Sequence, residues 1–182
     1  QSGAYFGYSI TPTYQLLTDP FEPLGVKIAT GAYRYTRSLI YASTDPSKVL
    51  NLQTMYSFGT YFNGRLRSGE WTLQFAPLPH ISLIGKFNRN RFIDVGELST
   101  STTIDLYSIE GRFALNPRIQ LITFYQQNSQ NNSKNYNIRF SWEYRPLSYI
   151  YIVLNQRQFQ NITLKRQVED QAICKISYLK QF

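Results

Sequence analysis

The chain has 182 residues, with 19 Lys and Arg against 11 Asp and Glu, which gives a formal net charge of +8. Charged residues make up only 16% of it and aromatic residues another 16%, which excludes a disordered chain and a helical bundle rich in Ala, Glu, Leu and Lys. The single cysteine, Cys174, and the single histidine, His80, exclude an internal disulfide and any cysteine-rich or multi-histidine metal site within the chain.

The first third of the chain predicts β-strands from its content of Tyr, Thr and Ile. The strands expected there are Ala4–Thr11, Gly31–Ala42 and Val49–Phe62. One residue fits this interpretation poorly, because the frame that turns Tyr33 and Tyr35 outward also turns Arg37 outward.

Further segments alternate apolar and polar residues with the period of two that indicates a strand. These segments are Trp71–Phe75, Ile81–Asn88, Tyr107–Leu115 and Cys174–Phe182. Two others, Ile119–Gln127 and Tyr149–Arg157, are apolar at both sets of positions. They are predicted to be strands, but the sequence does not assign their facing.

The purest alternation lies in Tyr136–Arg145. Its even positions are all apolar or aromatic: Tyr136, Ile138, Phe140, Trp142 and Tyr144. Its odd positions are all polar or charged: Asn137, Arg139, Ser141, Glu143 and Arg145. A helix with 3.6 residues per turn would mix the two sets, so this segment is a strand. Its length matches the 9–11 residues that a tilted strand needs to cross a bilayer.

The connections between these strands alternate in character. Short turns that contain proline are expected at Thr44–Ser47, Ala76–Pro79, Leu115–Arg118 and Arg145–Ser148. Longer polar loops are expected at Asn90–Thr103, Asn128–Asn135 and Gln158–Asp170. Short turns at one end and long loops at the other are typical of outer-membrane barrels. We therefore expect one all-β domain over residues 1–182, an antiparallel up-and-down transmembrane β-barrel with about ten strands in this chain.

A soluble lipocalin-like barrel would turn the same apolar positions inward. The aromatic set is too bulky for a small lumen and suits an outer wall, where Tyr and Trp form interfacial girdles. The expected lipid-facing aromatic residues are Tyr136, Phe140, Trp142, Tyr144 and Tyr178. The expected lumen charge network, in which acids and bases pair, consists of Glu70, Lys86, Glu110, Arg112, Arg139, Glu143 and Arg145.

The stretch Asn137–Asn155 (NIRFSWEYRPLSYIYIVLN), with Lys175, Tyr178 and Phe182 after it, resembles an uncharacterised C-terminal outer-membrane β-barrel domain. That domain occurs in Bacteroidota proteins behind a carbohydrate-binding family 9-like module. The shared pattern is an Arg-x-x-Trp-Glu-Tyr-Arg-Pro strand and turn followed by a hydrophobic run. This chain departs from it by having Leu147 in place of a turn glycine and Leu154 in place of Tyr.

The resemblance extends more weakly to Gly64–Asn90 and implies a location in the Gram-negative outer membrane, with no activity to carry over. Members of the family are much longer. The chain begins Gln1-Ser2-Gly3 without Met. We therefore expect a processed product or the C-terminal part of a longer polypeptide, with these strands possibly forming part of a larger barrel.

Few residues suggest catalysis. His80 follows Pro79 in a short turn, so a surface histidine is expected, although a Ser-His-Asp site of a barrel hydrolase or acyltransferase stays open. Cys174 is expected to be a small apolar residue on the outward face. Glu110 and Glu143 suggest a two-carboxylate glycosidase only if they are not paired with lumen arginines. No cofactor or metal site is expected.

The sequence therefore predicts an outer-membrane barrel without enzymatic activity, acting as a narrow pore, a scaffold or a component of a larger outer-membrane complex. A barrel-embedded hydrolase or acyltransferase and a soluble lipocalin-like binder are the alternatives. Expected partners are outer-membrane lipid and lipopolysaccharide, other outer-membrane subunits and the barrel-assembly machinery. That machinery would recognise a terminal signal of Ile176, Tyr178 and Phe182. The scattered basic residues do not indicate nucleic acid.

Overall fold

The computed structural model describes residues 3–160 and 166–179. These residues are almost entirely β-structure, with one short 3-10 turn, Pro23–Gly25. The ten strands are β1 (Tyr5–Leu17), β2 (Gly31–Ser43), β3 (Leu50–Tyr61), β4 (Gly64–Leu78), β5 (Ile81–Val95), β6 (Thr100–Asn116), β7 (Ile119–Asn128), β8 (Ser133–Arg145), β9 (Ser148–Gln160) and β10 (Arg166–Ser177).

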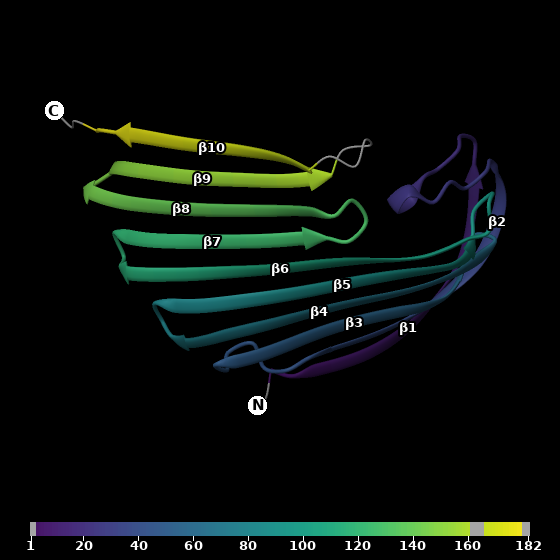
Figure 1. Ribbon diagram of the computed structural model, residues 1–182. Coiled ribbons are helices and arrows are strands. Elements are labelled where there is room, and N and C mark those ends of the chain that lie inside the picture. Colours follow the sequence, from purple (N-terminus) through teal and green to yellow (C-terminus); the bar gives the residue numbers. More distant parts are fainter. Residues whose placement is uncertain (1–2, 161–165, 180–182) are drawn as a thin grey trace. The chain divides into compact units, whose positions relative to one another are not determined.

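Each strand pairs with the next along the chain (Figure 1), so the sheet has the order β1 to β10. This confirms the all-β, antiparallel, up-and-down arrangement expected from the alternation. Within the described residues β1 and β10 are the two edges of the sheet, and they are not paired with each other. No helix in the described part of the chain is long and apolar enough to cross a membrane.

Several strand boundaries differ from those expected. The predicted loop Asn90–Thr103 is mostly strand, because β5 continues to Val95 and β6 begins at Thr100. Much of the predicted loop Gln158–Asp170 also lies in β9 and β10, so the last strand begins well before Cys174. Polar composition was misleading here, because pairing with a neighbouring strand satisfies the backbone whatever the side chains are.

The described residues form two compact units. Of the described residues, unit 1 consists of 3–47, 51–72 and 87–105, and unit 2 consists of 48–50, 73–86, 106–160 and 166–179.

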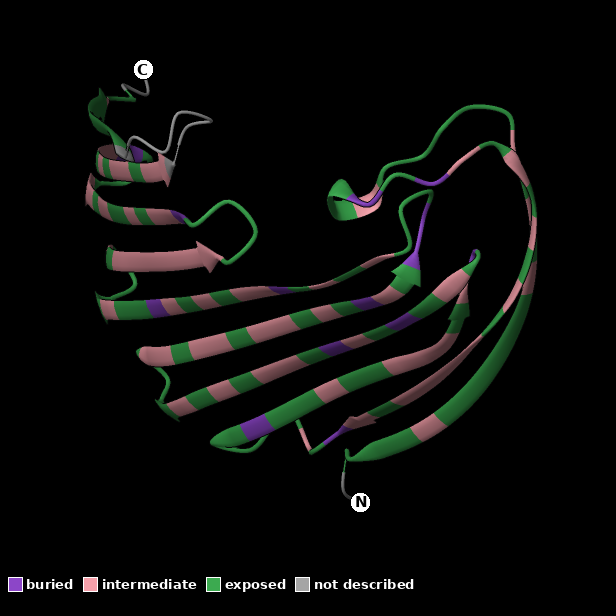
Figure 2. Cartoon of the chain, turned by 45° about the vertical axis from the view of Figure 1, so that its right-hand side comes forward, coloured by how far each residue is buried: buried purple, intermediate pink, exposed green. Residues whose placement is uncertain are grey.

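Unit 1 holds a hydrophobic core that the sequence did not predict. The connection between β1 and β2, residues 18–30, folds onto one face of the strands and buries Val26 and Ile28 (Figure 2). The buried residues of this core are Val26, Ile28, Phe62, Leu66, Phe92, Val95 and Ile104. At about 25 cal/mol per Å² of buried apolar area, such side chains hold the connection against the sheet.

Backbone contacts also fix this connection. Phe21 and Ile28 bond to each other through both backbone N–H groups, with N···O distances of 3.1 and 2.8 Å. The N–H of Glu97 donates to the carbonyl of Lys27 at 2.9 Å, and the two side chains form an ion pair at 3.3 Å. Gly96 has φ +85°, and a Cβ there would lie 2.3 Å from the same carbonyl, so only glycine fits this close approach.

The poor fit of Arg37 is explained by this core. Tyr33 and Tyr35 pack against the core instead of facing outward, so the outward frame assumed from the sequence is wrong. Arg37 shares their face and donates hydrogen bonds to the carbonyl of Leu66 and to Oγ of Ser57. A guanidinium with these acceptors is tolerated beside the aromatic rings.

Candidate functional site

The register of unit 2 assigns each side chain to one of two faces, because directly paired residues of antiparallel strands point the same way. One face, called the apolar face here, carries three adjoining rows across β6 to β10. They are Phe113, Leu121, Phe140, Ile152 and Cys174; Gly111, Thr123, Ile138, Leu154 and Ala172; and Ile109, Tyr125, Tyr136, Gln156 and Asp170.

This register settles the facing that the sequence left open. Leu121 on β7 and Ile152 on β9 both pair with Phe140, so they belong to the apolar face. Their alternate neighbours Ile122 and Val153 pair with Arg139 on the opposite face, which is called the mixed face here. The apolar face is therefore nearly uniform, whereas aliphatic and charged side chains share the mixed face.

The apolar face ends in a polar border. The rings of Tyr125 and Tyr136 lie with their centroids 4.8 Å apart. The hydroxyl of Tyr125 donates to Gln127 at 2.9 Å, and Nε2 of Gln156 donates to Asp170 at 2.9 Å. Aromatic rings beside hydrogen-bonding groups at the edge of an apolar band are typical of a membrane interface.

Four of the five aromatic residues expected to face lipid are gathered on this side. Tyr136, Phe140 and Trp142 alternate along β8 and pair with apolar-face residues. The Trp142 and Tyr144 rings lie 6.3 Å apart, and the Tyr144 hydroxyl donates to the carbonyl of Ser177 at 3.0 Å. Tyr178, the fifth, is exposed just beyond the end of β10.

The mixed face carries a ladder of side-chain amides. Nδ2 of Asn137 on β8 donates to Oδ1 of Asn155 on β9, and Nδ2 of Asn155 donates to Oε1 of Gln171 on β10 at 3.2 Å. The three residues are directly paired across the strands. Such a ladder satisfies polar groups within the sheet, which allows this face to be enclosed.

The structure brings together only part of the expected charge network. Glu110 and Arg112 form an ion pair at 2.6 Å on the mixed face. Glu143 instead accepts a 2.9 Å hydrogen bond from the backbone N–H of Leu147. Leu147 has φ +59°, a conformation that glycine adopts more readily than leucine, so the Glu143 hydrogen bond stabilises the turn that leucine strains.

The other members of the network are placed separately. Arg139 lies on the mixed face, and Lys86, Arg139 and Arg145 are exposed and form no ion pair with any described residue. Glu70 lines a cavity of about 110 Å³ in unit 1, together with Tyr5, Tyr41 and Met55.

One strong ion pair was missed by the sequence reasoning. Nε and Nη2 of Arg89 donate to the two carboxylate oxygens of Asp105, both at 2.8 Å, which makes the pair bidentate. Arg89 directly precedes the predicted loop Asn90–Thr103, and Asp105 lies two residues after it. The alternation gave no signal for the longer strand, because Arg89 and Arg91 occupy the positions that continue the apolar set of Ile81–Asn88 and so break the pattern.

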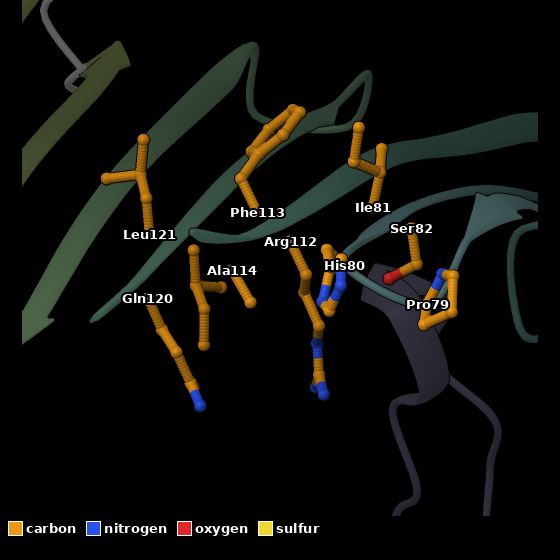
Figure 3. A pocket seen from close by; sticks show the side chains of 10 residues that line it. Pro79, His80, Ile81, Ser82, Arg112, Phe113, Ala114, Gln120 and Leu121 are labelled. Carbon is orange, nitrogen blue, oxygen red and sulfur yellow. The ribbon is translucent and has the colours of Figure 1, made fainter. Parts of the chain in front are cut away.

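His80 lies in the turn between β4 and β5, as expected, and is exposed. It borders a cavity of about 270 Å³ with Ser82, Arg112 and Gln120 (Figure 3). Figure 3 shows Phe113 and Leu121 directed away from Arg112 and Gln120. Within the described residues no side-chain hydrogen bond joins His80 to a serine or an aspartate, and no three His, Cys, Asp or Glu side chains cluster as metal ligands would.

The terminal signal is described only in part. Ile176 pairs with Ile150 on the apolar face and is 67% exposed, Tyr178 is exposed, and Phe182 lies outside the described residues. Cys174 pairs with Ile152 and is an exposed free thiol.

Comparisons of the chain with protein-family models, with curated proteins and with solved structures gave no match.

Proposed function

We propose that the chain forms the wall of a transmembrane β-barrel in a Gram-negative outer membrane, without enzymatic activity, as a narrow pore, a scaffold or a component of a larger complex. The observation that carries this proposal is the uncovered apolar face. Ile152, Leu154 and Trp142 are among the large apolar side chains of this face that are at least 40% exposed. Contiguous apolar surface of this extent is rare on soluble monomers and suits contact with lipid.

The exposed side chains of unit 1 also favour an apolar outer face over the polar outer face of a soluble binder. Segment 18–30 covers the face that carries Tyr33 and Tyr35. The other face of β1 carries Phe6, Ile10 and Leu16, which are 57–73% exposed. In a lipocalin-like barrel the covered interior would carry the apolar set and the exterior would be polar. Here the covered face carries the hydrophobic core, and the uncovered face of β1 also carries exposed apolar side chains where a soluble barrel would have a polar exterior.

The lengths of the strands agree with the height of the apolar band of an outer-membrane barrel. At about 3.4 Å per residue, β8 rises roughly 27 Å from Tyr136 to Tyr144, and strand tilt would reduce its height across the bilayer. The apolar band of outer-membrane barrels is about 25 Å tall. The shortest described strand has 10 residues, within the range that crosses a bilayer. The resemblance of Asn137–Asn155 to an outer-membrane domain supports the compartment.

We expect the barrel to close by pairing between the two edge strands. An exposed edge of 12 or 13 residues invites pairing with another chain. Because the strand number is even and neighbours are antiparallel, β1 and β10 run in opposite directions and can pair.

Cysteine cross-linking tests closure, because Cys174 lies on the apolar face of β10. Cysteine placed at Phe6, Tyr8, Ile10 or Tyr14, all on the uncovered face of β1, is expected to form an intramolecular disulfide with Cys174 at one of these positions. Ser9→Cys and Thr11→Cys, on the covered face, are the matched controls and are expected not to react. Disulfide-linked dimers would instead show that two copies pair, and the absence of any cross-link would show that other strands complete the wall.

The lumen is expected to be closed to general solutes. Small barrels are filled by their own side chains, and the mixed face contributes the Glu110–Arg112 pair and the amide ladder. Planar-bilayer recordings of the purified protein should therefore show no large, stable conductance steps. Large steps with weak selectivity would contradict the narrow lumen and indicate a wider barrel.

A further inference from the structure

Five arginines stand on the uncovered face of unit 1, and together they are called the arginine patch here. They are Arg34 on β2, Arg65 and Arg67 on β4, and Arg89 and Arg91 on β5. All five are exposed. Their facing follows from their neighbours, because Leu66 and Phe92 are buried in the core and the residues that alternate with them point to the other face. Arg34 pairs with Tyr14, which shares the uncovered face of β1.

The patch holds far more positive than negative charge. Asp105 neutralises Arg89 through the bidentate ion pair. Arg34, Arg65, Arg67 and Arg91 form no ion pair with any described residue. A face that also carries the exposed apolar residues Phe6, Ile10 and Leu16 thus holds uncompensated guanidinium groups.

Contacts between β4 and β5 indicate that Arg67 and Arg91 stand opposite each other. Trp71 on β4 stacks on Phe87 on β5, and Gly64 approaches the carbonyl of Asp94. Both contacts are consistent with a register that places Arg67 opposite Arg91 on the same face. Directly opposite side chains have Cβ atoms about 5 Å apart, and like charges in such a pair are destabilising. An anion bound between the two arginines would remove this repulsion.

The surroundings favour an anion that carries apolar chains. Trp71 and Phe87 stack with ring centroids 5.3 Å apart, and the guanidinium of Arg89 lies 5.3 Å above the Phe87 ring. Trp71 is four residues from Arg67 along β4, about 13 Å at the rise of a strand. A lipid whose phosphate sits at Arg67 and Arg91 would run its acyl chains past this aromatic pair.

We propose that the arginine patch binds the phosphate groups of an anionic membrane lipid and thereby selects that lipid from the surrounding bilayer. Guanidinium groups bind phosphate through two parallel hydrogen bonds, which suits a pair of neighbouring arginines better than single lysines. The apolar and aromatic setting favours a lipid over a soluble phosphate. The inference rests on the proposed membrane location.

Quenching of tryptophan fluorescence by brominated lipids tests whether the arginine patch binds an anionic lipid. The two tryptophans lie in different units, so each one reports on the lipid around its own unit. A variant with Trp142→Phe leaves Trp71 to report on the patch, and a variant with Trp71→Phe leaves Trp142 to report on the apolar face of unit 2. Both are reconstituted in vesicles of phosphatidylcholine mixed with brominated phosphatidylcholine, brominated phosphatidylglycerol or brominated lipid A.

Trp71 is expected to be quenched preferentially by the phosphate-rich anionic lipids, and Trp142 by all lipids alike. The preference is the ratio of the affinity for anionic lipid to that for phosphatidylcholine, as Trp71 quenching reports it. The double variant Arg67→Gln, Arg91→Gln should reduce this ratio about 30-fold, since each surface arginine contributes about fivefold to binding of anionic lipid. Arg139→Gln with Arg145→Gln removes the same charge from unit 2 and should leave the preference intact.

Other outcomes overturn the inference in distinguishable ways. Equal quenching of Trp71 by neutral and anionic lipids would overturn the lipid site and leave the membrane proposal standing. A preference abolished by inorganic phosphate, but not by chloride at equal ionic strength, would show a site for free phosphate instead. Absence of quenching by any lipid in both single-tryptophan variants would overturn the membrane location itself.

Discussion

Phe140→Arg is expected to destabilise the folded chain in lipid vesicles by about 2–4 kcal/mol, the cost of an arginine near the middle of the lipid-facing band that we propose. Phe140 pairs with Leu121 and Ile152, so the new charge would have only apolar neighbours in its row. The free energy of unfolding can be measured by urea titration of the vesicle-bound protein, followed by tryptophan fluorescence.

The adjacent position provides a matched control. Ser141 pairs with Gln120 and Tyr151 on the mixed face. Ser141→Arg adds the same charge to the same strand, and it should change the free energy of unfolding far less. Equal costs at both positions, or a near-neutral Phe140→Arg, would show that the assigned facing is wrong.

Ile28→Ala is expected to cost about 2–5 kcal/mol in the stability of unit 1, which is usual when a fully buried aliphatic side chain is truncated. Ile28 is 0% exposed and belongs to the core beneath segment 18–30. Its backbone N–H donates to the carbonyl of Phe21. Hydrogen exchange of this amide should therefore accelerate as the segment detaches from the sheet.

Leu24→Ala is the control for this prediction. Leu24 lies in the same segment but is 43% exposed, so its truncation should change amide exchange at Ile28 little. If both variants left exchange at Ile28 unchanged, segment 18–30 would not be held by the core that the structure shows.

The sequence by itself determined the local structure of this chain. A period of two over Tyr136–Arg145 allows only a strand, because no helix separates the two sets of side chains. Proline and polar residues marked the short turns, and consecutive antiparallel strands then needed no long crossover connections. These local features were sufficient for the number of strands and their up-and-down order, both of which the structure confirms.

Only the tertiary structure decided which residues face together and what covers them. Leu121 and Ile122 are equally apolar, and only the pairing with Phe140 and Arg139 assigns them to different faces. The polar composition between Arg89 and Asp105 predicts a loop, and only the pairing of β5 with β6 in the structure shows that most of it is strand. Segment 18–30 has no periodicity, and its burial depends on Phe62, Phe92 and Ile104, which are distant in the sequence. Contacts between such distant residues leave no local pattern, which is the physical reason that the core and the uncovered arginine patch became visible only in the folded chain.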